Sequence, residues 1–563
     1  MMTNNENNKA GWKRPAPGSP LFWFSLLGLV LFLAAFAFWE PAETVGARLR
    51  DAFLITLAIV AAAALGRLFV CWVRRPGNLK RFLFGLAVVI TLVAAICIEE
   101  NIRGWLAWKR FQREAAAQGI SLEPQSVIPP SVPDEENFAM APIFKDLRLM
   151  LDPEWGANPA GHPRPTGQLA RVEFRPRAKK RENFGRDWQT GKRANLAAWQ
   201  KAYREDPDFP SPPQPGSPAE DVLFALSKFD PVVNGLREAA RRPQSRFPVY
   251  YEQGFDAPMS HLRPLRTLVS LLSLRATAEL AAGQSEQALA DTLLILRITE
   301  SLRSEPFLIS HLVRLAMLEN ALAPVWEGWV DHRWNEEQLA ALEEALGKLD
   351  FPADCRLAFH GELVFSELYV DAEVRPRPFI SLMLRGWVYQ NKAALGRLYL
   401  ESLLPIIDAK ARVISPAAAR KAQEIRRRIC TPRRPWNFMA AMLAPPLETS
   451  LMRFAFGQAH ADLARAAIAL ERFRLARGSY PESLDAVAPE FLKKPPHDIV
   501  NGGPLKYRRV GDRFLLYSVG WNETDDGGTI SVSGKGALQL DQGDWVWPLP
   551  SSESGKPARP GVD

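Results

Sequence analysis

The side chains best suited to chemistry in this 563-residue chain are a few histidines and the acidic residues near them. The most acidic neighbourhood of a histidine contains His360, Glu362, Glu367, Asp371 and Glu373. A pair of carboxylates, or a histidine beside a carboxylate, is what general acid–base hydrolysis requires. On a helix, positions 360 and 362 point away from each other. The spacing therefore favours a solvated helix over a metal site or an active site.

The established catalytic motifs are missing from the sequence. There is no H-E-x-x-H, no G-x-S-x-G, no Walker A loop and no G-x-G-x-x-G. The adjacent pairs Ser260-His261 and Ser310-His311 say nothing about a nucleophile, because the members of a catalytic triad meet only through folding. We therefore predict no catalytic and no cofactor-binding residue, although one sequence does not exclude an enzyme.

Three apolar blocks near the N-terminus determine where the rest of the chain is placed. They are Leu21 to Trp39, Ala52 to Val73, and Phe82 to Ile98. Each has close to the roughly 20 residues that a helix needs to cross about 30 Å of hydrocarbon. Only Arg67 puts a charge inside a block, close enough to its end to reach the headgroups. The blocks predict three transmembrane helices at 21–98, after a cytoplasmic tail at 1–20.

Basic residues near these blocks set the orientation. They precede the first block and fill the second loop: Lys9, Lys13, Arg14, Arg74, Arg75, Lys80 and Arg81. The positive-inside rule then places the N-terminus in the cytoplasm and everything after Glu99 outside it. Since most of the chain is placed there and the full chain has a net charge of +8, membrane lipid and other anionic surfaces are expected partners, and nucleic acid is not. Cys355 and Cys430 either form a disulfide in that compartment or stay two separate buried thiols.

Composition divides the outer portion into four stretches. Residues 99–218 are a juxtamembrane helix followed by a Pro- and Arg-rich linker region, in which 169–174 alternates like a short strand. Residues 219–446 are a helical module, residues 447–550 an α+β domain, and residues 551–563 a disordered tail.

Within the helical module the apolar residues recur with a period of 3.6, which predicts antiparallel helix pairs. Gly283 is expected to end one helix and Ser285 to cap the next. Asn335 and Gln338 form an N-x-x-Q capping signal. The pair around Gly283 weakly resembles a tetratricopeptide hairpin, but the chain has no clean 34-residue period.

The C-terminal domain carries a recognisable order of elements. A long amphipathic helix, Ala461 to Arg477, ends at Gly478 and is followed by the sequence SYPESL. Two strand-like runs, Lys506 to Val510 and Arg513 to Val519, are joined by a Gly-Asp turn and predict a hairpin that covers the helix. This order resembles the C-terminal half of the major pseudopilin of type II secretion systems, over roughly a fifth of the chain.

The resemblance implies an α+β fold with a small antiparallel sheet and a structural calcium ion in the loop after the second strand. The matching oxygen-bearing residues here are Asn522, Asp525, Asp526 and Asp544. Calcium takes six to eight oxygen ligands, so this loop is a candidate site, and an acidic solvated loop is the alternative. The chain lacks the pseudopilin leader and its Phe-Thr-Leu-x-Glu helix. We therefore do not expect it to polymerise.

Taken together, the sequence predicts a multi-domain fold: three transmembrane helices, an all-α helical-hairpin module and a C-terminal α+β pseudopilin-like domain. The function that suits this topology is that of a membrane-anchored extracytoplasmic binding or scaffolding protein of the bacterial envelope. It would have an envelope protein as partner, and the likeness to a pseudopilin connects it with a secretion-type assembly. The alternative is an envelope hydrolase that acts on glycan or peptide.

Overall fold

The computed structural model describes residues 77–152, 172–177, 187–374, 385–429, 438–443, 447–534 and 536–550, with single positions before and between these stretches. The chain forms two compact units, residues 1–99 and 100–563, and each is described by itself. The predicted tails, and the first two apolar blocks apart from single positions, lie outside the described residues.

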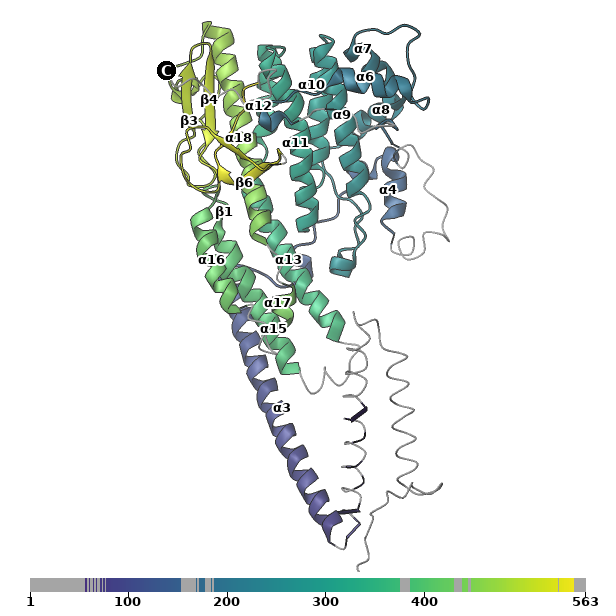
Figure 1. Ribbon diagram of the computed structural model, residues 1–563, viewed down its shortest axis with the longest axis vertical. Helices are drawn as coiled ribbons and strands as arrows, with labels where there is room; N and C mark the ends of the chain where they lie inside the picture. Colours follow the sequence, from purple (N-terminus) through teal and green to yellow (C-terminus); the bar gives the residue numbers. More distant parts are fainter. Residues whose placement is uncertain are drawn as a thin grey trace, which may run out of the picture. The chain divides into compact units, whose positions relative to one another are not determined.

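Helices make up most of the described chain, and its strands are short (Figure 1). The helices are α3 (Asn78–Ala117), α4 (Lys145–Met150), α6 (Leu196–Glu205), α7 (Pro218–Leu226), α8 (Asp230–Ala240), α9 (Leu262–Ala281), α10 (Ser285–Glu300), α11 (Leu308–Val330), α12 (Glu336–Gly347), α13 (Phe351–Val374), α15 (Arg385–Arg397), α16 (Pro416–Ile429), α17 (Phe438–Leu443) and α18 (Leu447–Arg477). The strands are β1 (Ile407–Asp408), β2 (Val413–Ile414), β3 (Lys506–Val510), β4 (Arg513–Ser518), β5 (Ile530–Val532), β6 (Leu538–Gly543) and β7 (Trp545–Val546).

Helix α3 joins the third apolar block to the predicted juxtamembrane helix without a break. Two helices of the described chain, α3 and α11, are long and apolar enough to cross a membrane. Most of the apolar window of α11 is buried inside the protein, as in the core helix of a soluble unit, whereas that of α3 is not buried at all.

The helical module is built around α9, α10 and α11, which pack side by side (Figure 1). Gly283 ends α9 with a φ of +77°, which confirms the predicted C-terminal glycine. The capping box of Asn335 and Gln338 is confirmed by two reciprocal bonds of 2.8 and 3.1 Å. The predicted cap by Ser285 is wrong, because Gln284 occupies that position without a side-chain bond, and the Ser285 hydroxyl accepts a bond from Gln338.

Two further expectations, one about this module and one about the linker region before it, are corrected. The module is not all-α, because β1 and β2 form a small antiparallel pair. Strands of two residues are too short to show alternation in a sequence. The turn between them is held by Asp408 Oδ1, which accepts bonds from the backbone N–H groups of Lys410 and Ala411. In the linker region before the module, the short strand that the alternation at 169–174 permits is absent at Val172 to Phe174, where the described backbone is irregular.

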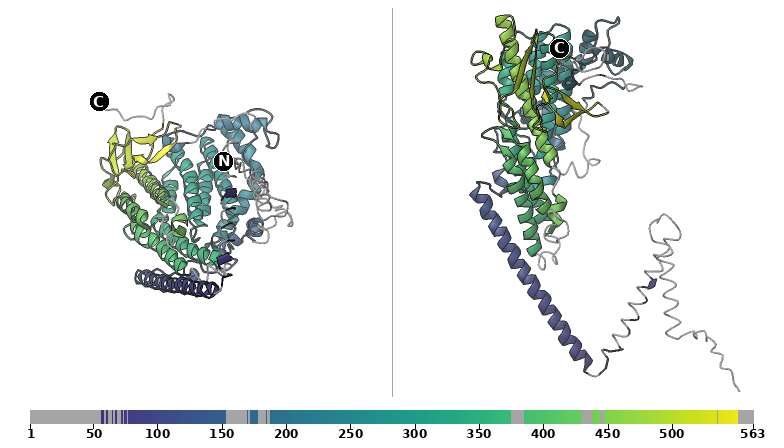
Figure 2. Two further views of the ribbon diagram at one scale, coloured as in Figure 1. Left: turned by 60° about the horizontal axis from the view of Figure 1, so that its bottom comes forward. Right: turned by 60° about the vertical axis from the view of Figure 1, so that its left-hand side comes forward.

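The long C-terminal helix α18 begins at Leu447, well before the predicted start at Ala461. It is buried on two sides, by α11, α12 and α13 on one and by β4 and β7 on the other (Figures 1 and 2). Seven of its alanines, Ala464 and Ala467 among them, are buried and allow neighbours to approach closely on both sides. The prediction of one apolar face was therefore incomplete.

The predicted hairpin is confirmed by β3 and β4, whose register pairs Val510 with Arg513 across a two-residue Gly-Asp turn. β7 adds a third strand in the order β3-β4-β7, and β5 pairs with β6. One continuous apolar core includes residues of both the helices and these strands. The boundaries predicted at 218 and 446 consequently lie inside one compact unit.

Candidate binding site

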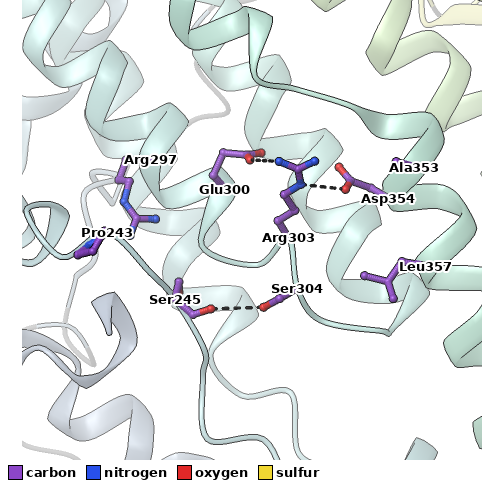
Figure 3. Close-up of a pocket in the computed structure, with 9 residues that line it drawn as sticks. All are labelled: Pro243, Ser245, Arg297, Glu300, Arg303, Ser304, Ala353, Asp354 and Leu357. Atoms are coloured by element: carbon purple, nitrogen blue, oxygen red, sulfur yellow. Dashed lines mark hydrogen bonds and ion pairs between the residues drawn. The ribbon is translucent and has the colours of Figure 1, made fainter. Parts of the chain in front are cut away.

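An open depression of about 550 Å³ lies where α10, α13 and the segment before α9 come together (Figure 3). Its lining combines apolar and polar side chains and includes two arginines and two carboxylates: Pro243, Ser245, Arg297, Glu300, Arg303, Ser304, Ala353, Asp354 and Leu357. We call it the arginine depression. Two arginines at the end of one helix and the following turn are positioned for anionic groups.

An ion network forms one wall of this depression. Arg303 Nε donates to Asp354 Oδ1 at 3.2 Å, and its Nη1 lies 3.7 Å from Glu300 (Figure 3). Beneath it, the fully buried Arg314 donates to Asp354 at 2.9 Å and to Glu300 at 2.5 Å. Burial acts to lower the pKa of Arg314, but the two carboxylates outweigh it and raise that pKa. Each carboxylate thus bridges two arginines.

Arg297, on the opposite wall, is held differently. Its Nη2 donates to the backbone carbonyls of Arg242 and Gln244, at 2.6 and 3.1 Å, and its guanidinium lies 4.9 Å from the centre of the Phe138 ring. Burial lowers the pKa of Arg297, and the charge of Glu300 opposes this only in part. Since carbonyls and an aromatic ring carry no full negative charge, this cation is less neutralised than Arg303 or Arg314.

Two of the histidines considered in the sequence, His261 and His311, lie buried in the core and both contact Glu305. His261 Nε2 lies 2.8 Å from Glu305 Oε1, and Ser310 donates its hydroxyl to the other oxygen of the same carboxylate. His311 Nε2 lies 2.8 Å from the Glu305 carbonyl, while Arg314 approaches its Nδ1 at 3.0 Å. Burial, and then the charge of Arg314, lower the pKa of His311 to about 3. His311 is therefore neutral at pH 7, and its Nδ1 can accept the hydrogen bond from Arg314.

This group of Ser, Glu and His is not arranged as a catalytic triad. The carboxylate lies between the hydroxyl and the His261 ring, whereas a nucleophile must bond to the base directly. All of these side chains are also buried. We conclude that the group holds α9 and α11 together.

The acidic neighbourhood of His360 is dispersed by the fold. His360 Nε2 lies 2.6 Å from the Ser121 carbonyl. Glu362 accepts the backbone N–H of Leu308 at 3.0 Å, at the N-terminus of α11, and burial raises its pKa to about 7. Burial likewise raises the pKa of Glu367 to about 8. The Asp371 carboxylate pairs with Lys392 at 2.9 Å. These side chains have separate partners, and the burial of Glu362 and Glu367 does not fit the predicted solvated helix.

Of the four predicted calcium ligands, Asn522, Asp526 and Asp544 are connected by hydrogen bonds in the C-terminal loop. Asp544 Oδ2 accepts the N–H of Gly528 at 2.6 Å, and burial raises the pKa of Asp544 to about 6. Asn522 donates to Asp526 at 2.9 Å. These contacts tie the loop together without an ion.

The remaining carboxylate of that loop, Asp525, accepts a bond of 2.8 Å from the Tyr517 hydroxyl and lies 3.2 Å from Lys506 Nζ. Among the described residues, no group of three or more His, Cys, Asp or Glu side chains is placed to hold a metal. Calcium would therefore need backbone or amide oxygens as well, and would have to displace Lys506. The site stays a prediction.

Comparisons with family models, with curated proteins and with solved structures found no match. The function is therefore argued from the residues of this chain. Cys355 is a buried free thiol, and burial raises its pKa, while its predicted partner Cys430 lies outside the described residues.

Sequence reasoning missed the arginine depression altogether. One signal was present: Arg314, three residues after His311, lies within the apolar run from Leu312 to Leu318. A charge on a buried helical face requires buried partners of opposite sign.

Proposed function

We propose that this chain is a membrane-anchored extracytoplasmic binding or scaffolding protein of the bacterial envelope. The observation that carries the proposal is the division of α3 into two halves. From Leu83 to Ile98 its large apolar side chains are exposed, whereas Gly104, Trp108 and Phe111 farther along are buried in the core of the folded unit. An exposed apolar helix of this length is suited to lipid.

The second half of α3 holds the folded unit tightly. Gly104 lies so close to Gly386 of α15 that a Cβ added to it would be 2.1 Å from the Gly386 carbonyl oxygen. Farther along, Arg397 of α15 lies 3.5 Å from Glu114 of α3. The second half of α3 is thus packed as part of the core of the folded unit.

The binding role rests on the arginine depression and the C-terminal region. The depression offers Arg297 and Arg303 at an open surface, which suits an anionic group of a protein partner. The pseudopilin resemblance supports a secretion-type assembly as the setting. In its SYPESL segment, the Tyr480 hydroxyl donates to Glu471 of α18 at 2.6 Å, so that the motif fastens the segment to the helix.

Photo-crosslinking in native membranes tests the binding role. A photoreactive residue in place of Leu357, in the depression, is expected to capture the same envelope protein in repeated experiments. The matched control is the same residue in place of Leu475, which is exposed on α18. Capture at both positions alike, or at neither, would contradict a binding role for the depression. Reporter fusions at the two ends test the topology, with the N-terminus expected in the cytoplasm and the C-terminus outside it.

The second candidate is an envelope hydrolase that acts on glycan or peptide. The pKa values of Glu362 and Glu367, raised by burial to about 7 and about 8, are the observation that favours it, since general acids need such values. Both carboxylates, however, lie in helix contacts. Exclusive capture of glycan at Leu357, with loss of a hydrolytic activity in Glu362→Gln, would put this candidate first.

A further inference from the structure

The outward face of α3 just beyond its apolar span is unusual for a helix surface in water. Ile102, Trp105 and Leu106 are 55, 48 and 53 % exposed. At 100° per residue these positions lie opposite Gly104 and Phe111, which face the core. A water-facing helix normally presents polar side chains there, so this apolar face needs an explanation.

Basic residues follow on the same side. Lys109 and Arg110 are exposed one turn after Leu106. The Cα–Cβ bonds of a helix tilt toward its N-terminus. Because α3 leaves the apolar span in the N-to-C direction, these two side chains lean back toward that span. Their charges therefore come within reach of groups level with Trp105.

Distances along α3 place the apolar and the basic residues of this face relative to the bilayer. A rise of 1.5 Å per residue puts Trp105 about 10 Å and Lys109 about 16 Å beyond Ile98. If the span begins at Lys80, about 30 Å of hydrocarbon extends to position 100 or so. The headgroup layer adds about 5 to 8 Å more. Trp105 then lies about 7.5 Å beyond the hydrocarbon, within that layer, and Leu106 lies at its outer edge, at about 9 Å. The backbone of Lys109 and Arg110 lies about 13.5 to 15 Å beyond the hydrocarbon, so these long side chains reach the headgroups by leaning back toward the span.

A second exposed apolar group lies near the same level of the folded unit. Gly386, near the start of α15, donates its N–H to Asn101 of α3 at 2.6 Å. Five residues along α15, Asn391 accepts a bond of 2.8 Å from the N–H of Met439 in α17. On α17, Phe438 is 54 % exposed and Met442 is 63 % exposed.

We propose that the face of α3 formed by Ile102, Trp105, Leu106, Lys109 and Arg110 is an interfacial lipid-binding surface. Its apolar part inserts at the boundary of acyl chains and headgroups, and its basic part binds the phosphates of anionic phospholipids. Tryptophan prefers this boundary, and each basic side chain near an anionic surface adds about a five-fold preference. The inference rests on the proposed crossing of the membrane by α3.

Photo-crosslinking of the full chain tests this surface in native membranes and in nanodiscs of phosphatidylcholine with and without phosphatidylglycerol. A benzophenone residue replaces Leu106, Ala117 or Ile90 in separate variants. Ala117 is the matched control on the same side of α3, about three turns farther from the span. We expect an adduct with the mass of one phospholipid at position 106 and none at position 117.

Crosslinking at position 90 tests the membrane crossing of α3 separately from the interfacial surface. Failure to obtain lipid adducts at Ile90 would overturn the membrane crossing itself. Adducts at position 90 but not at position 106, or a protein captured at 106 in native membranes, would overturn the interfacial surface alone. In mixed nanodiscs, adducts at 106 should be enriched in phosphatidylglycerol, and Lys109→Gln with Arg110→Gln should remove that enrichment. Unchanged enrichment would contradict the role of the two basic residues.

Discussion

The buried ion network beneath the arginine depression predicts a large loss of stability for Arg314→Met. The guanidinium is completely buried and bonds to Asp354, Glu300, His311 and the Thr299 carbonyl. Methionine fills a similar volume, so that the cavity left behind is small. The cost comes from the two carboxylates, which lose a buried counter-ion.

Breaking a buried pair by removing one partner costs about 3 to 5 kcal/mol. Arg303 still faces Asp354 at 3.2 Å and limits the loss, so we expect about 3 kcal/mol. His311 is not expected to replace the lost charge, because burial, the largest cause of its lowered pKa, remains in the variant. Urea unfolding followed by pulse proteolysis, with the full chain in nanodiscs, measures the change in free energy of unfolding.

Arg241→Met is the matched control. Arg241 pairs with Glu238 at 3.0 Å, with side chains 76 and 65 % exposed, and such surface pairs contribute about 0.5 kcal/mol or less. Equal losses in the two variants would refute the reasoning. The double variant Arg314→Met with Asp354→Asn should cost less than the sum of the single changes, because one unpaired charge is removed.

Three further predictions concern helix packing, pH and calcium. Gly104→Ala should destabilise the folded unit by about 1 to 3 kcal/mol in the same assay, because the added Cβ meets the Gly386 backbone, whereas Gly85→Ala in the same helix meets nothing within 4 Å and should be neutral. Burial raises the pKa of Glu367 to about 8 from 4.5, so its contribution to stability is complete below about pH 4.5 and is lost as pH rises through 8; Glu367→Gln should flatten that decline in unfolding measured from pH 5 to 8.5. If the acidic loop binds calcium, millimolar calcium should raise the melting temperature of the full chain at pH 7 and Asp544→Asn should abolish the rise; an equal rise in the variant would exclude Asp544 as a ligand.

The sequence predicted those features that depend on local pattern. The Gly511-Asp512 hairpin, the Asn335 capping box and the glycine at the end of α9 each follow from a few adjacent residues, and each was confirmed. The extent of α18 did not follow from a pattern, because a helix buried on two sides shows no single apolar stripe. Ala464 and Ala467 give no sign of a buried face in the sequence, although their small side chains permit that close packing.

The candidate site was less accessible to prediction than the fold. Arg297, Arg303 and Asp354 come from different elements, and their sequence separation gives no sign that they share a surface. The residues that did attract attention, His261 and His311, are used in the core. Residue type indicated that these side chains were unusual, but only the packing of α9 against α11 decides what they do.

The bond between Trp326 and Pro548 has a consequence for how this chain is made. The indole N–H of Trp326, near the end of α11, donates to the Pro548 carbonyl 222 positions later at 2.8 Å, and Trp326 and the adjacent Trp547 belong to the same core. Since the chain is synthesised from its N-terminus, the part of the core around Trp326 cannot be completed until β7 and the residues after it have been made. Until then, the side of α18 that β4 and β7 cover stays exposed to water. Chains that stop before residue 545 should therefore present an apolar surface to holding chaperones and proteases.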